Sequence, residues 1–180
     1  IDFARKIKNL SLEAMAYRLL GLKSVVEGKV PLGKEYYRRA FELAEKAGDK
    51  NQMALSLNNI VNLIDNNLDE RITGFNSVIE LSREADNRLV EAYAVGNIGW
   101  SYALAGNYEK AVEYMKIAYQ KLEALDSQSD LVEVFDGLSQ FNFKMGKYEE
   151  SLFWAEKCFQ KEKELGILRD NAPNGLYRKF

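Results

Sequence analysis

The side chains that most often perform catalysis are scarce in this chain of 180 residues. It contains no histidine, which removes histidine triads, histidine metal ligands and the usual general base near neutral pH. The single cysteine, Cys158, stands where a small packing residue is expected, and a buried thiol acts there as a small apolar group. Glu149 and Glu150 stand at an expected helix start, where negative charge complements the helix dipole. We therefore expect neither an enzyme nor a metal or cofactor site.

Composition favours a helical, water-soluble protein. The chain is 47% apolar and 29% charged, and it contains only two prolines, as expected where long helices exclude this residue. A net charge of -2 argues against nucleic acid as a partner, because clustered basic side chains supply most of that affinity. No apolar stretch approaches the roughly 20 residues that cross a bilayer. The lone cysteine favours a reducing compartment, and we expect a cytoplasmic protein.

An internal repeat organises the chain. Aligned on itself with an offset of 40 residues, the sequence places Gly106 on Gly146 and Tyr108 on Tyr148. Apolar residues recur three and four positions apart on both sides of each glycine, so each block predicts a helix, a tight turn and a second helix. A single block cannot bury its own apolar face, and stacking on neighbouring blocks must supply stability.

The spacing of small and large residues resembles the tetratricopeptide repeat (TPR) family, in the branch with a longer period of 40 residues. The third block carries the motif most fully, with Val95, Ile98, Gly99, Tyr102, Gly106, Tyr108, Ala111, Met115 and Ala118 in order. This resemblance implies an all-α fold, a right-handed superhelical solenoid of antiparallel helix pairs with a concave groove. The tyrosines after the turns, Tyr108 and Tyr148, are expected to fill the gap between repeats.

The period divides residues 1–180, taken as one TPR-like domain, into four repeats. They are expected at 14–53, 54–91, 92–131 and 132–171, with the end of a preceding helix or a cap at 1–13 and the start of a following helix at 172–180. The second repeat is irregular, because it is about two residues shorter than the others; either its turn or one of its helices is reduced. Both ends look cut, so we expect a segment of a longer protein that can self-associate through uncapped ends.

In this family the ligand usually follows the concave groove, which is lined by the first helix of each repeat. The resemblance assigns Met15, Arg18, Leu19, Leu22, Val25 and Val26 to the groove in the first repeat. Across the later repeats it predicts partner contacts at Asn58, Asn59, Asn62, Tyr93, Asn97, Trp100, Gln140 and Phe143. Carboxamides can donate to and accept from a peptide backbone, and large rings often anchor interfaces. The alternatives are ordinary surface asparagines and a Trp100 that belongs to the core between repeats.

Two functions fit these features. The first is a protein-protein interaction module that binds a peptide or partner domain in its groove. The second is a ligand-sensing segment of a bacterial signalling or transcription regulator, a class that the longer-period branch includes beside polarity scaffolds and kinesin light chains. The family's carboxylate clamp needs lysine and asparagine in adjacent repeats, and here only Arg18 and Lys144 are basic in the groove. A clamp of that type is therefore not expected.

Overall fold

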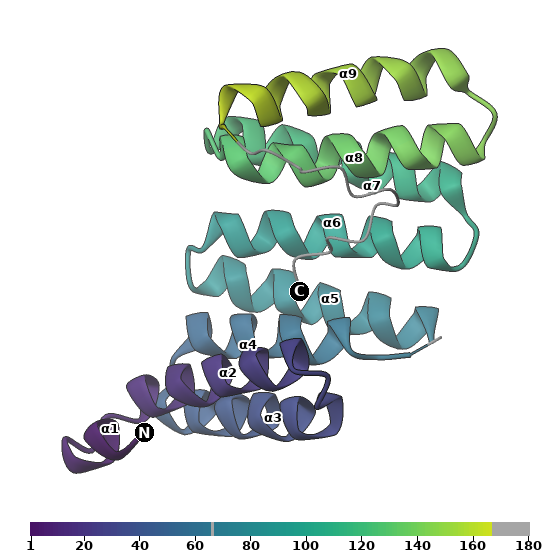
Figure 1. The fold of residues 1–180 in the computed structure, drawn as a ribbon. Coiled ribbons are helices and arrows are strands. Elements are labelled where there is room, and N and C mark those ends of the chain that lie inside the picture. The colour runs from purple at the N-terminus through teal and green to yellow at the C-terminus, as the bar shows by residue number, and fades with distance from the viewer. Residues whose placement is uncertain (66, 167–180) are drawn as a thin grey trace. The chain divides into compact units, whose positions relative to one another are not determined.

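Helices form nearly all of the structure. The computed structural model describes residues 1–65 and 67–166, and within them no strand occurs, which confirms the all-helical class. In chain order the elements are α1 (Asp2–Lys6), α2 (Leu10–Val26), α3 (Val30–Ala47), α4 (Lys50–Asn62), α5 (Leu68–Glu84), α6 (Arg88–Leu104), α7 (Tyr108–Ala124), α8 (Gln128–Lys144) and α9 (Tyr148–Glu164) (Figure 1). The helix expected at 172–180 lies outside the described residues.

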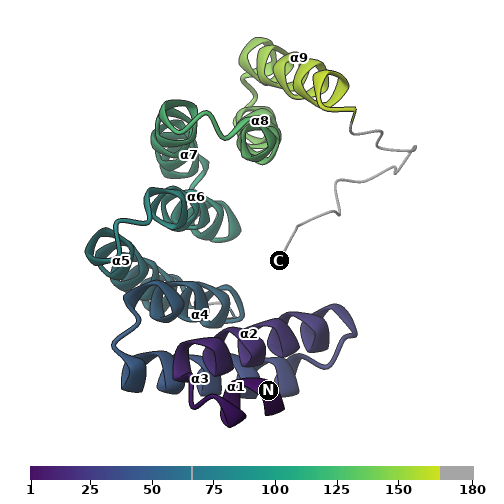
Figure 2. The ribbon, with the colours of Figure 1, turned by 90° about the vertical axis from the view of Figure 1, so that its left-hand side faces the viewer.

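The chain divides into two compact units, residues 1–94 and 95–180, and the division falls within α6. In the N-terminal unit α2 packs on α3, α3 on α4, and α4 on α5. In the C-terminal unit α7 packs on α8, and α8 on α9. Short turns join these neighbours, so consecutive helices run antiparallel within each unit (Figure 2). The predicted antiparallel helix pairs are therefore confirmed.

Side-chain caps and left-handed turn residues set the helix boundaries. Asn9, Asp49, Asn67 and Asn107 each accept a hydrogen bond from the backbone N–H three residues later, which satisfies one of the unpaired donors of a helix start. Gly106 (φ 78°) supplies the left-handed conformation between α6 and α7, where a residue with a Cβ is disfavoured. The helices α2, α4, α6 and α8 begin at 10, 50, 88 and 128, four residues before the motif positions that start the expected repeats.

Close helix contact in the N-terminal unit depends on glycine. A Cβ on Gly21 of α2 would lie 2.5 Å from the Tyr37 ring of α3, and one on Gly33 would lie 2.5 Å from a methyl group of Val25. Real Cβ atoms do not approach other heavy atoms so closely, so both positions need the smallest residue. The contact also corrects one groove position. Val25 packs toward α3, and the accessible side of α2 is formed by other residues.

The irregular second repeat has a short first helix. Helix α4 has 13 residues, whereas α2, α6 and α8 each have 17. Arg71 of α5 compensates for the missing turn, because its guanidinium donates to the carbonyl oxygens of Asn62 at 3.3 Å and Ile64 at 3.0 Å. The same guanidinium lies 5.6 Å from the centre of the Phe75 ring, and Arg71 is only 8% exposed. A buried arginine thus stabilises the end of α4.

Methionine and two glycines hold the C-terminal unit together. Met115 of α7 lies against Gly99 of α6 and against Gly137 of α8, with its side chain 3.3 and 3.0 Å from the positions where their Cβ atoms would be. Tyr108 lies 6.4 Å from Phe141 between α7 and α8, as its expected role between repeats requires. Tyr148 differs, because it is 65% exposed and its ring lies edge-on to Phe143 of α8 with ring centres 5.6 Å apart. Within the described residues α9 is the last helix, so no later helix covers that ring.

Candidate functional site

Three of the predicted contact residues, Asn58, Asn59 and Asn62, lie on the accessible side of α4. All three are partly exposed, whereas Met53, Ala54, Ser56 and Val61 of the same helix are buried. The helix is fixed at both ends. Asp49 caps its start through the Gln52 N–H at 3.0 Å, and Arg71 binds the Asn62 carbonyl at its end. The row of amides therefore lies on a helix that side-chain hydrogen bonds hold at both ends.

Helix α2 presents apolar side chains next to this row. Met15, Leu19 and Val26 are 40%, 46% and 73% exposed, and Leu22 between them is half-buried. Their spacing of four, three and four residues places them on one face of the helix. Exposed apolar side chains in such a row are unusual for a soluble protein surface and mark interaction sites.

Arg18 joins the two helices. Its Nε donates to Oε1 of Gln52 at 3.4 Å, which places the α2 stripe beside α4 within the N-terminal unit. Gln52 lies seven residues before Asn59 and ten before Asn62, so these three share one side of α4. We call the area formed by Met15, Arg18, Leu19, Leu22, Val26, Asn58, Asn59 and Asn62 the α2–α4 surface.

The Arg18 guanidinium has an unusual electrostatic environment. Burial lowers its pKa from the ordinary value, and the nearby Tyr37 opposes this effect. Among the described residues no carboxylate lies within ion-pair distance of it. A half-buried cation loses hydration, and an acidic partner normally compensates this cost. The α2–α4 surface therefore combines apolar area, amides and a cation that can accept an anionic partner.

The remaining predicted residues lie on α6 and α8. Tyr93 belongs to the N-terminal unit and is partly exposed. In the C-terminal unit Trp100 packs edge-on against Phe141 of α8 with ring centres 4.8 Å apart. Its ring also lies 3.4 Å from the position of a Cβ on Gly137. Trp100 thus contributes to the packing between α6 and α8, in keeping with the core alternative, while part of its ring stays accessible.

The polar predicted residues of the C-terminal unit are accessible, and each forms a hydrogen bond within its own helix. Gln140 donates to a carboxylate oxygen of Asp136 at 2.9 Å, one turn earlier on α8. Asn97 is partly exposed on α6, and its backbone oxygen accepts from the Ser101 hydroxyl at 2.7 Å. Phe143 is 59% exposed near the end of α8. Each unit therefore carries its own group of predicted contact residues, on α4 and at Tyr93 in the N-terminal unit, and on the rest of α6 and on α8 in the C-terminal unit.

The sequence prediction missed a cavity in the C-terminal unit. A space of about 410 Å³ opens between α7, α8 and α9, lined by the rings of Tyr119, Phe135 and Phe153 and by the ammonium-bearing Lys157 and Lys161. The Glu123 carboxylate accepts a hydrogen bond from the Tyr119 hydroxyl and, with burial, raises the pKa of that phenol above its usual value of 10. Only one local signal pointed here, the four-residue spacing of Phe153 and Lys157 on one helix face.

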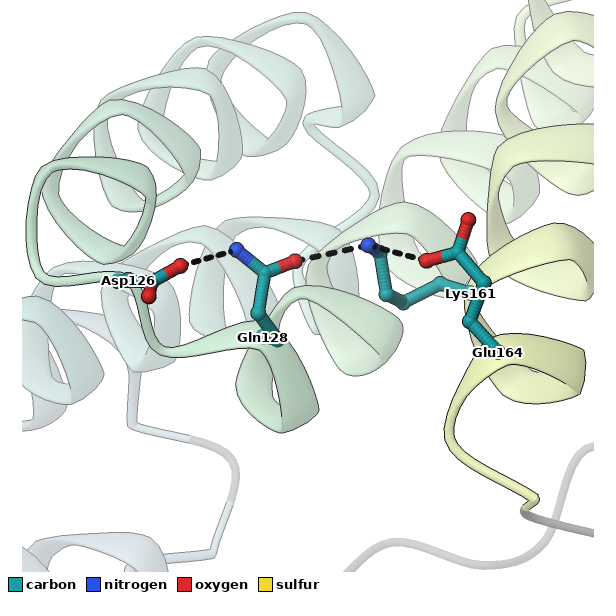
Figure 3. Close-up of polar contacts among 4 residues, drawn as sticks. All are labelled: Asp126, Gln128, Lys161 and Glu164. Carbon is teal, nitrogen blue, oxygen red and sulfur yellow. Dashed lines mark hydrogen bonds and ion pairs between the residues drawn. The ribbon is translucent and has the colours of Figure 1, made fainter.

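Lys161 is held in place at the rim of this cavity. Its Nζ donates to Oε1 of Gln128 at 2.7 Å and to Oε2 of Glu164 at 2.6 Å. The Gln128 amide nitrogen in turn donates to Asp126 at 2.6 Å, so one chain of contacts connects the start of α8 with the end of α9 (Figure 3). This ammonium is therefore already hydrogen-bonded and paired.

Other reactive side chains show no constellation for chemistry in the described part of the chain. Cys158 is buried, and its Sγ lies 3.5 Å from the Val132 carbonyl oxygen. Among residues 1–65 and 67–166, no group of three or more histidine, cysteine, aspartate or glutamate side chains is placed to hold a metal ion. In the same residues, no helix is long and apolar enough to cross a membrane.

Comparisons with known proteins identify the fold. No family profile and no curated protein sequence matches the chain. The apo form of RapI superposes with a TM-score of 0.77 at 18% identity, over 92% of this chain and 61% of that one. BtubC (BKLC) from P. vanneervenii gives 0.73 at 15% identity, over 92% and 69%. A Rap protein complexed with competence and sporulation factor gives 0.71 at 21% identity, over 92% and 52%.

These structures are TPR-like helical repeat proteins, and the chain shares that fold. It spans between 52% and 69% of their lengths. The predicted helical repeat is therefore confirmed by comparison as well as by the helix arrangement within each unit.

Proposed function

We propose that this chain is a protein-interaction module whose N-terminal unit binds an extended peptide segment of a partner on the α2–α4 surface. It acts by recognition and not by catalysis. One observation carries the proposal: a row of exposed apolar side chains on α2, including Leu19 and Val26, lies beside accessible amides on α4. Apolar area supplies affinity, and amides that donate and accept at once can bind a peptide backbone whatever its side chains.

Arg18 adds a preference to this binding mode. Its guanidinium is half-buried, and no carboxylate of the described residues pairs with it. An aspartate, glutamate or terminal carboxylate of the ligand would restore the compensation that burial removes. We therefore expect the bound segment to combine apolar side chains with one acidic group.

A second candidate function is a ligand-sensing segment of a regulator. The observation in its favour is the fold likeness to a Rap protein that was solved in complex with competence and sporulation factor. In that case the ligand occupies the same surface, and its binding is coupled to another part of a longer protein. Asn97, Trp100, Gln140 and Phe143 are proposed contacts of the C-terminal unit in either case. A cytoplasmic location also remains a proposal.

The test begins with a random peptide library displayed on phage and selected against the whole chain. We expect enriched sequences to contain spaced apolar residues and an acidic residue. A synthetic peptide from the selection is then titrated into wild type and into the double variant Asn58→Ala, Asn62→Ala by calorimetry. Two lost hydrogen bonds at about 1 kcal/mol each predict a Kd about 30-fold higher.

Matched variants distinguish the surface from general effects. Asn76→Ala changes an exposed asparagine of α5, away from the α2–α4 surface, and should leave the Kd unchanged. Arg18→Met should raise the Kd of the acidic peptide about tenfold and leave the Kd of its neutral amide analogue unchanged. Only a charge pair between Arg18 and the acidic group of the peptide predicts this difference. Unchanged binding by the double asparagine variant, or failure to select any peptide, would refute the proposed function.

A further inference from the structure

Four aromatic rings meet where α7, α8 and α9 of the C-terminal unit pack together. Phe135 of α8 stacks on Trp154 of α9 with ring centres 5.7 Å apart and an interplanar angle of 26°. Tyr119 of α7 lies 5.7 Å from Phe135 and 5.9 Å from Trp154, and Phe153 meets Trp154 edge-on at 5.1 Å. We call these four residues the aromatic cage. Phe135 is almost completely buried, whereas Phe153 is 50% exposed, so the cage has a floor and an accessible side.

An ammonium group already occupies the cage. Nζ of Lys157 lies 5.2 Å from the centre of the Phe153 ring and 5.9 Å from the centres of Phe135 and Trp154. Distances up to about 6 Å allow the ring quadrupole to attract a cation. Among the described residues no carboxylate lies within ion-pair distance of this ammonium, although Glu123, Glu156 and Glu164 line the same cavity. The rings therefore provide its main attractive contacts.

Repeat packing does not require these residue types. Forty positions earlier, Val95, Glu113 and Ile117 stand in place of Phe135, Phe153 and Lys157. The preceding repeat therefore lacks two of the four rings and the lysine. Residues that the repeat architecture needs return with the period, as the turn glycines Gly106 and Gly146 do. The cage is a specific feature of the last helix pair of the described residues.

The cavity can hold more than the lysine. Its volume of about 410 Å³ lies within the range of small-ligand sites. Its charged lining contains three carboxylates and two ammonium groups, and Lys161 is committed to Glu164 and Gln128. With Lys161 bound to Glu164, the carboxylates of Glu123 and Glu156 remain. The net charge near the cage therefore favours a positive ligand once the Lys157 ammonium moves out.

We propose that the aromatic cage is a binding site for an organic ammonium cation, of the quaternary or methylated class, and that Lys157 is its resident occupant and competitor. Lys157 can leave without unfolding, because its flexible four-carbon chain lets the head group move into water, where a primary ammonium is strongly hydrated. A quaternary ammonium loses less hydration and fits the preference of aromatic cages. The cation can be a free small molecule or a methylated lysine of a partner protein.

Trp154 fluorescence provides a direct readout. The chain has two tryptophans, so a Trp100→Phe background leaves Trp154 as the sole reporter while keeping a ring against Phe141. In this background the protein is titrated with choline, with its neutral carbon isostere dimethylbutanol, and with a short peptide containing trimethyllysine, all at constant ionic strength. We expect saturable changes with the two cations and none with the neutral isostere.

Substitutions then identify the competitor. Lys157→Met empties the cage and should tighten choline binding about fivefold, the value of one exposed cation-π contact. Lys161→Met removes the same charge from the same cavity but leaves the cage occupied, and it should change affinity less than twofold. Phe153→Leu keeps apolar volume without the ring and should abolish saturation. Tighter binding of the peptide than of choline would indicate a protein-borne cation, and the reverse would indicate a free one.

Three results would overturn the proposal. They are no saturable response to either cation in the Lys157→Met variant, equal binding of the neutral isostere, and equal gains from Lys157→Met and Lys161→Met. The last outcome would mean that only the overall charge of the cavity matters. Circular dichroism of each variant verifies folding before titration, so that loss of binding is not mistaken for loss of structure.

Discussion

Replacing Arg71 by methionine should destabilise the N-terminal unit and weaken peptide binding together. Methionine keeps an unbranched apolar stem of similar length but removes the guanidinium that donates to the carbonyl oxygens of Asn62 and Ile64. The Asn62 carbonyl lies at the end of the shortened helix α4 and the Ile64 carbonyl lies just after it, and both would lose this side-chain partner. Because Asn62 belongs to the α2–α4 surface, the end of the proposed binding row would also lose its fixed position.

The magnitude follows from three contacts. A hydrogen bond from a charged donor contributes about 1.5 kcal/mol at the low end of its range, and the bond at 3.0 Å has favourable length while the one at 3.3 Å is longer. Adding about 0.5 kcal/mol for the longer bond and about 1 kcal/mol for the cation-π contact with Phe75 gives a loss of about 3 kcal/mol. For a unit of this size that loss should lower Tm by more than about 10 °C.

The same substitution elsewhere on α5 is the control. Arg83 is exposed and pairs with the mostly buried Glu91 at 2.9 Å, and a pair whose cation stays in water contributes about 1 kcal/mol or less. Urea unfolding followed by circular dichroism should therefore separate Arg71→Met from Arg83→Met by more than about 2 kcal/mol. Hydrogen exchange should increase around residues 60–65 in the first variant only. Equal stability of the two variants would show that the buried guanidinium does not hold the end of α4.

Two further predictions concern packing and ionisation. Gly21→Ala should lower the free energy of unfolding by about 1 to 3 kcal/mol, because the added methyl group overpacks against Tyr37. Gly96→Ala gains a Cβ with ordinary contacts, so its higher helix propensity should raise the free energy of unfolding by about 0.5 kcal/mol or more. Thermal melts of the two variants compare these effects. Burial raises the pKa of Tyr37, and the Glu123 contact raises that of Tyr119. In a titration of tyrosinate absorbance at about 295 nm, both phenols should therefore ionise above the ordinary tyrosine value of about 10. Their stabilisation is fully present below pH 10 and is lost as pH rises through the higher folded pKa values.

The helix pairs could be predicted because the features that define them are local and repeat. Gly99, Ala111 and Met115 follow one another in the spacing of two facing helices, and the structure places Gly99 against both partners. The form of the short second repeat could not be predicted in the same way. The spacing does not distinguish a reduced turn from a reduced helix, and the contact that holds the end of α4 comes from Arg71, seven and nine residues further along the chain.

The candidate sites were predictable to different degrees for the same physical reason. Asn58 and Asn62 are one helix turn apart, so their common side follows from the sequence once α4 is assigned. The aromatic cage combines rings from α7, α8 and α9, which are separated by up to 35 residues from Tyr119 to Trp154. Only the three-dimensional arrangement brings them together and places Phe135, Phe153 and Trp154 around one ammonium group. Trp100 is intermediate, since its sequence position fits both the groove and the packing that it makes with Phe141.

Variation within the repeat distinguishes packing residues from candidate binding residues. The position of Gly21 is Val61 in the second repeat and Gly99 in the third, and both are buried between helices. The position of Leu22, one residue later, is Asn62, then Trp100, and then Gln140 in the fourth repeat. Every member of this second set is partly exposed, so packing does not constrain its chemistry to one type. Within the N-terminal unit the position stays accessible while its side chain changes from the aliphatic Leu22 to the amide Asn62, so it can supply an apolar and a polar contact to one ligand of the α2–α4 surface.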